Sequence, residues 1–242
     1  MNIRVLGKYG RFPQANAGTS SFLVGTDDGS ILLDMGCSSL SKLLMFIDIT
    51  GLSAVVLSHL HGDHIADFKA FTYMASIYKA EGRLKKDIIV YLPATPVNIY
   101  NEINSGNGLD YRIIKDGMVE QIGHTEISFY SLKHPIETYG VRLNNRKQIL
   151  AYTADTLLCD NLAPLIMNAD IVIGDACILS KNHKPTSPHL SVKELAVASR
   201  ENNVKKLILA HLPDYDIDKI LREARDQFND SVLAEEGKEI II

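Results

Sequence analysis

Residues 58–64, Ser-His-Leu-His-Gly-Asp-His, place four strong metal ligands close together: His59, His61, Asp63 and His64. Imidazole nitrogens and a carboxylate, without thiolate, suit zinc, manganese or iron. Side chains alternate along an extended loop, so His59 and His61 should point to the same side. As neighbours, Asp63 and His64 should diverge, which lets them serve a second ion. The alternative is a chance cluster of surface histidines, which is rare in a chain with eight histidines.

Four more residues of these types each follow an apolar segment that has the pattern of a strand: Asp34, His134, Asp155 and His211. In α/β folds, sites assemble at the ends of strands. Taken singly, each is ordinary as a turn residue. Together with the histidine cluster they would require four coincidences, so we interpret them as parts of one site.

Seven of these residues are enough to hold a pair of metal ions. One ion would be held by His59, His61 and His134, the other by Asp63, His64 and His211, with Asp155 bridging them and room for a bridging water. Paired ions stabilise the attacking and leaving oxygens and lower the pKa of bound water to about 7. The alternative is a single structural ion, but such sites typically have four ligands and often use cysteine.

The elements that must position these residues follow from the spacing of apolar side chains. Strand patterns cover 3–6, 19–24, 31–34, 54–57, 88–92, 126–133, 139–143, 148–153, 170–174 and 206–210, with short strands at 231 and 239. Helical patterns cover 39–47, 65–80, 96–103, 162–167, 191–202 and 217–228. Ser191 and Glu194 form a capping box that begins one of these helices. We predict one α/β domain over residues 1–242, in two roughly similar halves.

Composition limits the class of protein. With 242 residues, 46% of them hydrophobic, the chain is long enough for a sizeable core, and no apolar run approaches a membrane span. The start of the chain lacks a signal-peptide layout, and three scattered cysteines favour a reducing cytoplasm. The net charge of −4 argues against a large nucleic-acid footprint. His124, His183 and the three cysteines are predicted to be surface or packing residues.

The complete pattern resembles the metallo-β-lactamase superfamily over the whole chain. The resemblance is carried by Asp34, the His59-x-His61-x-Asp63-His64 motif, His134, Asp155 and His211. Within the superfamily the chain is similar to ribonuclease Z and related phosphodiesterases. Three stretches carry this finer likeness: Gly7-x-x-Gly10 with Asn16-x-Gly18-Thr19-Ser20-Ser21, Tyr152-Thr153-Ala154-Asp155-Thr156, and Asp175-Ala176-Cys177 with His189-Leu190-Ser191.

The chain departs from the ribonuclease Z pattern in two ways. Ala154 stands where that branch has Gly, and Asp175 and Cys177 stand where it has Glu and Thr. More importantly, ribonuclease Z carries a long arm between the third and fourth ligand motifs that grips tRNA. Here His134 and Asp155 are 21 positions apart (155 − 134), enough for a hairpin only. We therefore expect phosphodiesterase chemistry, with ribonuclease Z-type tRNA 3′-end processing as an alternative that the missing arm disfavours.

The resemblance implies a four-layer αβ/βα sandwich with the metals at one edge. It implies a cytoplasmic phosphodiesterase with two divalent ions, zinc first and manganese or iron as alternatives, and a hydroxide that bridges them and attacks phosphorus. Asp63 would orient the hydroxide, His189 would assist the leaving oxygen with Asp175 as its partner, and Asp34 would orient a ligand histidine. The expected substrate is a small phosphodiester or an RNA-like molecule, and the family suggests a homodimer.

Two other classes of function fit the sequence. Superfamily hydrolases of a lactone, thioester or β-lactam use nearly the same ligands, and the pair Asp175 and His189 discriminates against them. A metal-binding protein without turnover, such as a nucleic-acid-binding module, is the other class. The complete ligand set argues against a protein without turnover, and the acidic balance argues against a dedicated nucleic-acid binder.

Overall fold

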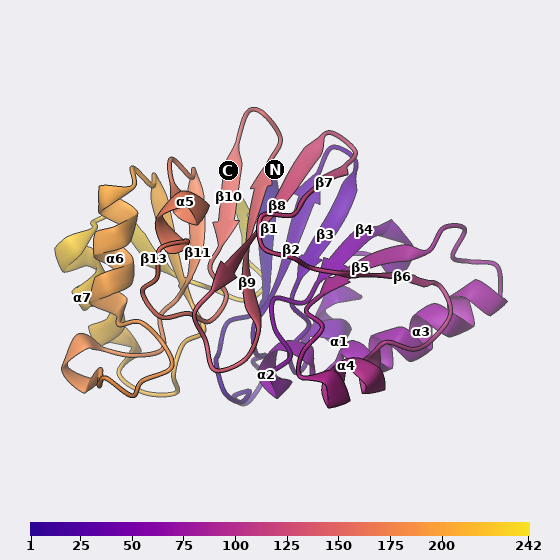
Figure 1. The fold of residues 1–242 in the computed structure, drawn as a ribbon, viewed down its shortest axis with the longest axis horizontal. Coiled ribbons are helices and arrows are strands. Elements are labelled where there is room, and N and C mark those ends of the chain that lie inside the picture. The colour runs from indigo at the N-terminus through magenta and orange to yellow at the C-terminus, as the bar shows by residue number, and fades with distance from the viewer.

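The computed structural model describes residues 1–242, and two mixed seven-stranded sheets form its centre (Figure 1). The first sheet has the order β14 (Glu239–Ile241), β1 (Asn2–Gly7), β2 (Ser21–Thr26), β3 (Gly29–Leu33), β4 (Leu52–Val56), β5 (Ile88–Leu92) and β6 (Leu109–Ile113). The second has the order β13 (Ser231–Leu233), β12 (Lys206–Ala210), β11 (Ile171–Asp175), β10 (Ile149–Tyr152), β9 (Thr138–Asn144), β8 (Thr125–Leu132) and β7 (Val119–Ile122).

Helices cover the outer face of each sheet. Beside the first sheet lie α1 (Ser39–Leu43), α2 (Gly62–Ile65), α3 (Phe68–Ala80) and α4 (Val97–Ile103), with the 3₁₀ turn η1 (Ile49–Gly51). Beside the second lie α5 (Leu162–Ile166), α6 (Val192–Glu201) and α7 (Ile217–Gln227), with the 3₁₀ turn η2 (Ser180–Asn182). The predicted four-layer αβ/βα sandwich is therefore confirmed. None of these helices combines the length and the apolar character that a membrane span requires.

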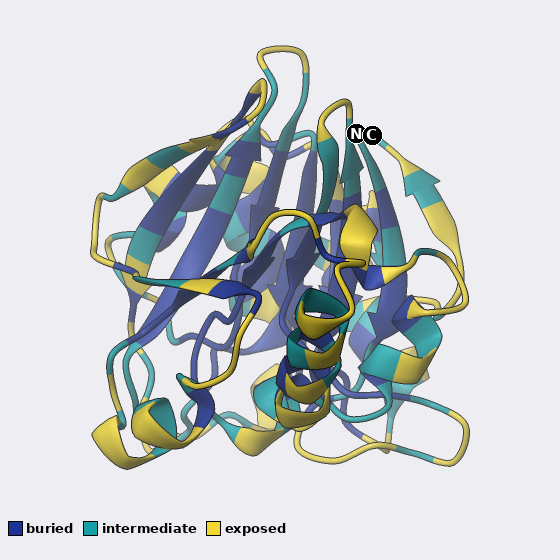
Figure 2. Ribbon diagram, turned by 90° about the vertical axis from the view of Figure 1, so that its right-hand side faces the viewer, coloured by how far each residue is buried: buried dark blue, intermediate teal, exposed yellow.

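Three apolar clusters separate the four layers. In β4, Ala54 and Val56 face the other sheet, whereas Val55 and the following Leu57 face the helices. The strand is buried on both faces, which explains why it reads as a continuous apolar run rather than an alternating one. Figure 2 shows the same pattern for the whole molecule, with buried strands and exposed outer faces on the helices.

Strand direction brings the predicted site residues to one edge. In the first sheet β3, β4, β5 and β6 run parallel, so the residues after β3 and β4 leave at the same end. In the second sheet β10, β11 and β12 run parallel, and β8 shares their direction because β9 is antiparallel to both β8 and β10. Asp34, His134, Asp155 and His211 therefore all follow strands at one edge of the sandwich.

Two helix predictions differ from the structure. The helix predicted over 39–47 ends at Leu43, because the N–H groups of Met45 and Phe46 donate to carbonyls three residues back and turn the chain out of the α-helix, which leaves their apolar side chains exposed. The helix predicted over 65–80 is divided into α2 and α3. The division follows from a tertiary bond, because the Asp67 N–H donates to the Met35 carbonyl at 3.2 Å instead of continuing the helix ladder.

Candidate metal centre

The histidine cluster begins extended and ends in a helical turn. The Leu57 N–H still donates to the Tyr91 carbonyl of β5, and His61 is extended as the residue before α2. Asp63 and His64 lie within α2, where Oδ2 of Asp63 comes to 3.7 Å from Nε2 of His64. The prediction that these two neighbours diverge was wrong, because it assumed an extended backbone where the chain is helical.

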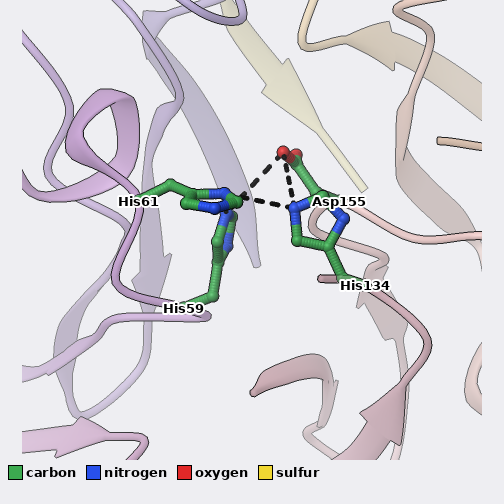
Figure 3. A group of neighbouring side chains, drawn as sticks. All are labelled: His59, His61, His134 and Asp155. Carbon is green, nitrogen blue, oxygen red and sulfur yellow. Dashed lines mark hydrogen bonds and ion pairs between the residues drawn. The ribbon is translucent and has the colours of Figure 1, made fainter. Parts of the chain in front are cut away.

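The first group of donors converges from three segments (Figure 3). Nδ1 of His61 lies 3.1 Å from Nε2 of His59 and 3.2 Å from Nε2 of His134. Oδ2 of Asp155 is 3.7 Å from the His59 nitrogen and 3.8 Å from the His134 nitrogen. Nitrogens around a tetrahedral zinc at about 2.0–2.1 Å would be about 3.3–3.4 Å apart, so the spacing of this group fits a cation.

The second group shares Asp155 with the first. Nε2 of His211 lies 3.2 Å from Oδ2 of Asp63 and 3.2 Å from Oδ2 of Asp155. Oδ1 of Asp155 lies 3.4 Å from Nε2 of His64. The seven residues expected to bind two ions thus form two groups joined by one carboxylate.

Buried polar atoms without partners mark the same place. Nε2 of His64, Oδ1 of Asp155 and Nδ1 of His211 are buried and make no hydrogen bond. Leaving such an atom unsatisfied costs about 1–3 kcal/mol, more when it is charged. A divalent cation would satisfy the first two, so the residues present fit the group that their chemistry implies.

Two of the ligand histidines are already in the neutral form that a cation requires. Burial lowers the pKa of His59 well below its usual value and that of His134 to about 4, so both rings are neutral at pH 7. Burial opposes the charge on His64, but the carboxylates of Asp155 and Asp34 outweigh it and raise its pKa to about 10. These carboxylates hold a proton on His64. A cation that binds to His64 competes with this proton, so metal binding should release the proton.

Asp34 lies against the second group. It is fully buried after β3, with a left-handed φ of 57°, and its Oδ2 accepts from Nδ1 of His64 at 2.7 Å. A hydrogen bond to the far ring nitrogen is how proteins orient a metal-binding histidine.

His189 and Asp175 form a second pair beside the ligands. Nδ1 of His189 donates to Oδ2 of Asp175 at 2.7 Å, and Oδ1 of Asp175 lies 3.3 Å from Nδ1 of His211. Burial disfavours a charged His189, but Asp175 outweighs it and raises the pKa of His189 to about 9. The His189 ring centroid is 5.3 Å from that of His134 and 5.1 Å from that of His211. The capping box of α6 is present, and it already occupies the N–H groups of Ser191 and Glu194.

The loop between β1 and β2 packs onto the second group. The Arg11 N–H donates to Oδ2 of Asp63 at 2.8 Å, and the Gly10 N–H donates to the Leu212 carbonyl at 3.0 Å. A Cβ added to Gly10 would lie 2.5 Å from Cε1 of His211. Glycine is therefore required for the close approach of this loop to the histidine.

Three residues near the site were given no role from the sequence. Ser58 and Tyr152 both hydrogen-bond to Asp34. Cys177, which we predicted to be a surface or packing residue, is buried and lies close to both His189 and His211. Its place two residues after Asp175, at the end of a strand, was the signal that could have identified it.

The comparisons with known proteins agree with this geometry. A family profile described as "Beta-lactamase superfamily domain" matches residues 30–212. The "Probable metallo-hydrolase YhfI" of Bacillus subtilis is 29% identical over 239 residues, covering 96% of each chain. Its crystal structure, described as a metallo-beta-lactamase fold protein, aligns with a TM-score of 0.93 over 99% of this chain and 98% of that one.

Ribonuclease Z proteins are more distant relatives. That of Salinispora arenicola is 24% identical over 291 residues, covering 96% of this chain and 93% of the relative. The short form of human tRNase Z, at 17% identity, shares the fold with a TM-score of 0.78 over 100% of this chain and 99% of that one. The chain belongs to the beta-lactamase superfamily domain family and has the metallo-β-lactamase fold, and its clustered histidines and aspartates fit the divalent metal that the family implies.

Proposed function

We propose that this hydrolase is a phosphodiesterase that holds two divalent ions, with zinc the expected metal, and acts on small diesters. The observation that carries the proposal is the pairing of His189 with Asp175 directly beside two donor groups that share Asp155. Hydrolysis of an alkyl phosphodiester needs a strong nucleophile and a proton for the departing oxygen, and these residues can serve both needs.

The cations, when bound, would supply Lewis acidity toward the phosphoryl oxygens and lower the pKa of water. The first would be held by Nε2 of His59, Nδ1 of His61 and Nε2 of His134. The second would be held by Asp63, His64 and His211, with Asp155 shared.

Asp63 orients the attacking water. Its pKa is well below the usual range, because hydrogen bonding to His211 and the charge of His64 outweigh the effect of burial, so it is a carboxylate at pH 7. The Arg11 N–H fixes its Oδ2, which is also the atom nearest His211. A carboxylate held in this way can accept a proton from water in the site.

His189 delivers the other proton. Because Nδ1 donates to Asp175, Nε2 of the protonated ring is the atom that can donate to the leaving oxygen. General acids of this kind contribute typically 10²–10⁴-fold to the rate. A thioester releases a thiolate, which departs without such a proton, so the presence of this acid favours the phosphodiester over the thioester.

The short connection between the third and fourth ligand motifs favours a small substrate. Only β9, β10 and the hairpin between them separate His134 from Asp155. The long arm expected for gripping tRNA in ribonuclease Z has no counterpart here. The homodimer suggested by the family remains a prediction, testable by sedimentation.

A substrate panel tests the proposal. Bis(p-nitrophenyl) phosphate, a lactone, a thioester and a β-lactam would be assayed with purified protein of measured metal content. We expect hydrolysis of the diester only, and loss of that activity in His61→Ala. His124→Ala is the matched control, because His124 is exposed and bonds only to Asp28, far from the ligands. Turnover of a lactone or thioester in preference to the diester would overturn the proposal.

Metal content tests the ligand assignment separately. We expect about two zinc ions per chain by elemental analysis, and loss of at least one in His61→Ala and in His211→Ala. Chelation should abolish activity, and His124→Ala should retain both ions. A fully active enzyme with a single ion would contradict the assignment of two donor groups.

A further inference from the structure

Asp34 is the centre of a buried hydrogen-bond network. Its Oδ1 accepts from the Ser58 N–H at 2.7 Å. Its Oδ2 is reached by Oγ of Ser58 at 2.8 Å, Nδ1 of His64 at 2.7 Å and the hydroxyl of Tyr152 at 2.6 Å. Ser58 has one more neighbour, Nδ1 of His59, at 3.0 Å from its Oγ. All five residues are buried, with at most 4% of their surface exposed.

The protons of this network can be assigned by counting. A carboxylate only accepts, so His64, Ser58 and Tyr152 must each direct a proton to Asp34. Ser58 has a single hydroxyl proton, and it donates this proton in its hydrogen bond to Asp34. The remaining contact of Ser58, with His59, is then possible only if Nδ1 of His59 donates to Oγ of Ser58.

Both histidines therefore carry a proton on Nδ1, which leaves Nε2 as the ring atom whose lone pair can go to a cation. The Nε2 atoms are the ones that face the other ligands, His61 and Asp155 for His59, and Asp155 and Asp63 for His64. The opposite tautomer of either ring would direct an N–H at the cation and exclude it.

We propose that Ser58 and Tyr152 are positioning residues of the metal site, which act through Asp34. Asp34 fixes the tautomer of His64 directly and that of His59 through Ser58, so one carboxylate prepares a ligand for each ion. The inference rests on the proposed metal site, but it does not depend on the substrate.

Tyr152 adds a link between the two sheets. It belongs to β10 of the second sheet, three residues before the shared ligand Asp155 (155 − 152), whereas Asp34 follows β3 of the first sheet. Its hydroxyl bond to Asp34 thereby sets the segment that carries Asp155 against the segment that carries the histidines. The ring itself packs against Phe22, with the two centroids 5.4 Å apart, so Tyr152 acts on the site through its bond to Asp34.

The first test uses Ser58→Ala, with Ser199→Ala as its matched control. Ser199 is equally buried, but its hydroxyl donates to a carbonyl within α6. We expect Ser58→Ala to weaken binding of one zinc ion by about 10–100-fold, the usual effect of losing a partner of a ligand histidine. The control should bind both ions as the wild type does.

The second test uses Tyr152→Phe, with Tyr139→Phe as its control, because the Tyr139 hydroxyl bonds only to Glu137. We expect weaker binding of the ion that His64 holds, with the His59 tautomer unchanged. This variant removes a single oxygen and keeps the ring, so it tests the network even where Ser58→Ala fails to fold.

Nitrogen NMR of the histidine rings supplies a readout that a merely structural role would not move. In zinc-loaded wild type, Nδ1 of His59 and of His64 should both appear protonated, and in Ser58→Ala only the His59 signals should change. Protonated Nε2 in either ring, or unchanged zinc affinity in both variants, would overturn the inference. Failure of wild-type protein to bind zinc would instead overturn the metal site itself.

Discussion

At the scale of single residues, His189 offers the sharpest test of the proposed chemistry. We expect His189→Ala to lower kcat on an alkyl phosphodiester by roughly 10²–10⁴, because the leaving alkoxide would lack its proton. The loss should be smaller with a p-nitrophenyl ester, whose leaving group departs without a proton. The measurement is kcat on both substrates at equal metal content, and equal losses would remove the general-acid role.

The same residue predicts a pH dependence. The pKa of His189 is raised to about 9, so the acid form is present below that pH and is lost as the pH rises through it. Bound cations would lower this value, so the rate on alkyl esters should fall at or below about pH 9. His189→Ala should lack this fall, and a wild-type rate that keeps rising past pH 10 would contradict the assignment.

Ala154 shows how one residue balances two opposing effects. Its φ of 49° is left-handed, which costs an alanine about 1–2 kcal/mol, whereas Gly adopts it freely. The side chain is also buried in the core between the sheets, and deleting a buried methyl costs about 0.8 kcal/mol. Ala154→Gly should therefore change the free energy of unfolding by no more than about 1 kcal/mol.

A larger side chain at position 154 should lower the free energy of unfolding. Ala154→Val should destabilise by at least about 1 kcal/mol, because a branched side chain meets both the strained backbone and the packed core. Denaturant unfolding of both variants measures the difference. A strongly stabilised Ala154→Gly would mean that backbone strain outweighs packing here.

At the scale of elements, the loop between β1 and β2 should control the second metal position. Gly10→Ala would push the His211 ring out of place, because the new Cβ has no room beside it. We expect loss of zinc bound by the second group, with the first group less affected. Gly62→Ala is the control, since a Cβ on Gly62 meets nothing within 4 Å although it lies between His61 and Asp63.

Calorimetric titration with zinc would separate the two variants. Full binding of two ions by Gly10→Ala would show that the loop can move aside without effect on His211. Weak binding by Gly62→Ala would show that backbone changes anywhere in this segment disturb the ligands.

The elements also show what a sequence can and cannot predict. β5 and β12 have the bounds that their apolar runs predict, and His211 follows β12 as expected. Local patterns sufficed there because the strands are buried on both faces. The contacts of Arg11 with Asp63 and of Tyr152 with Asp34 join residues 52 and 118 positions apart, which no local spacing records.

The backbone conformation of residues 58–64 could not be predicted from the sequence either. The spacing of His59, His61, Asp63 and His64 identified the donor types, but the switch from extended chain to the α2 turn decides which atoms meet. His61 presents Nδ1, whereas His59 and His134 present Nε2, and only the folded geometry shows this difference.

At the scale of the whole molecule, the compact hairpin between β9 and β10 predicts the size of the substrate. We expect efficient hydrolysis of small diesters, but weak cleavage of precursor tRNA that falls steeply with salt, since phosphate contacts would supply most of that binding. Cleavage assays with precursor tRNA at low and at physiological salt measure this salt dependence. Accurate trimming of tRNA 3′ ends at physiological salt would contradict the prediction.

The division of the ligands between the two sheets has a consequence for survival of the protein in the cell. The 58–64 segment belongs to the first sheet, and His134, Asp155 and His211 belong to the second. Metal binding and closure of the sandwich are then linked by mass action. A cation whose free concentration is 100 times its dissociation constant adds about 2.7 kcal/mol to the free energy of unfolding. Metal starvation would open the chain about a hundred times more often and expose it to proteolysis, so metal supply would set the abundance of the enzyme as well as its activity.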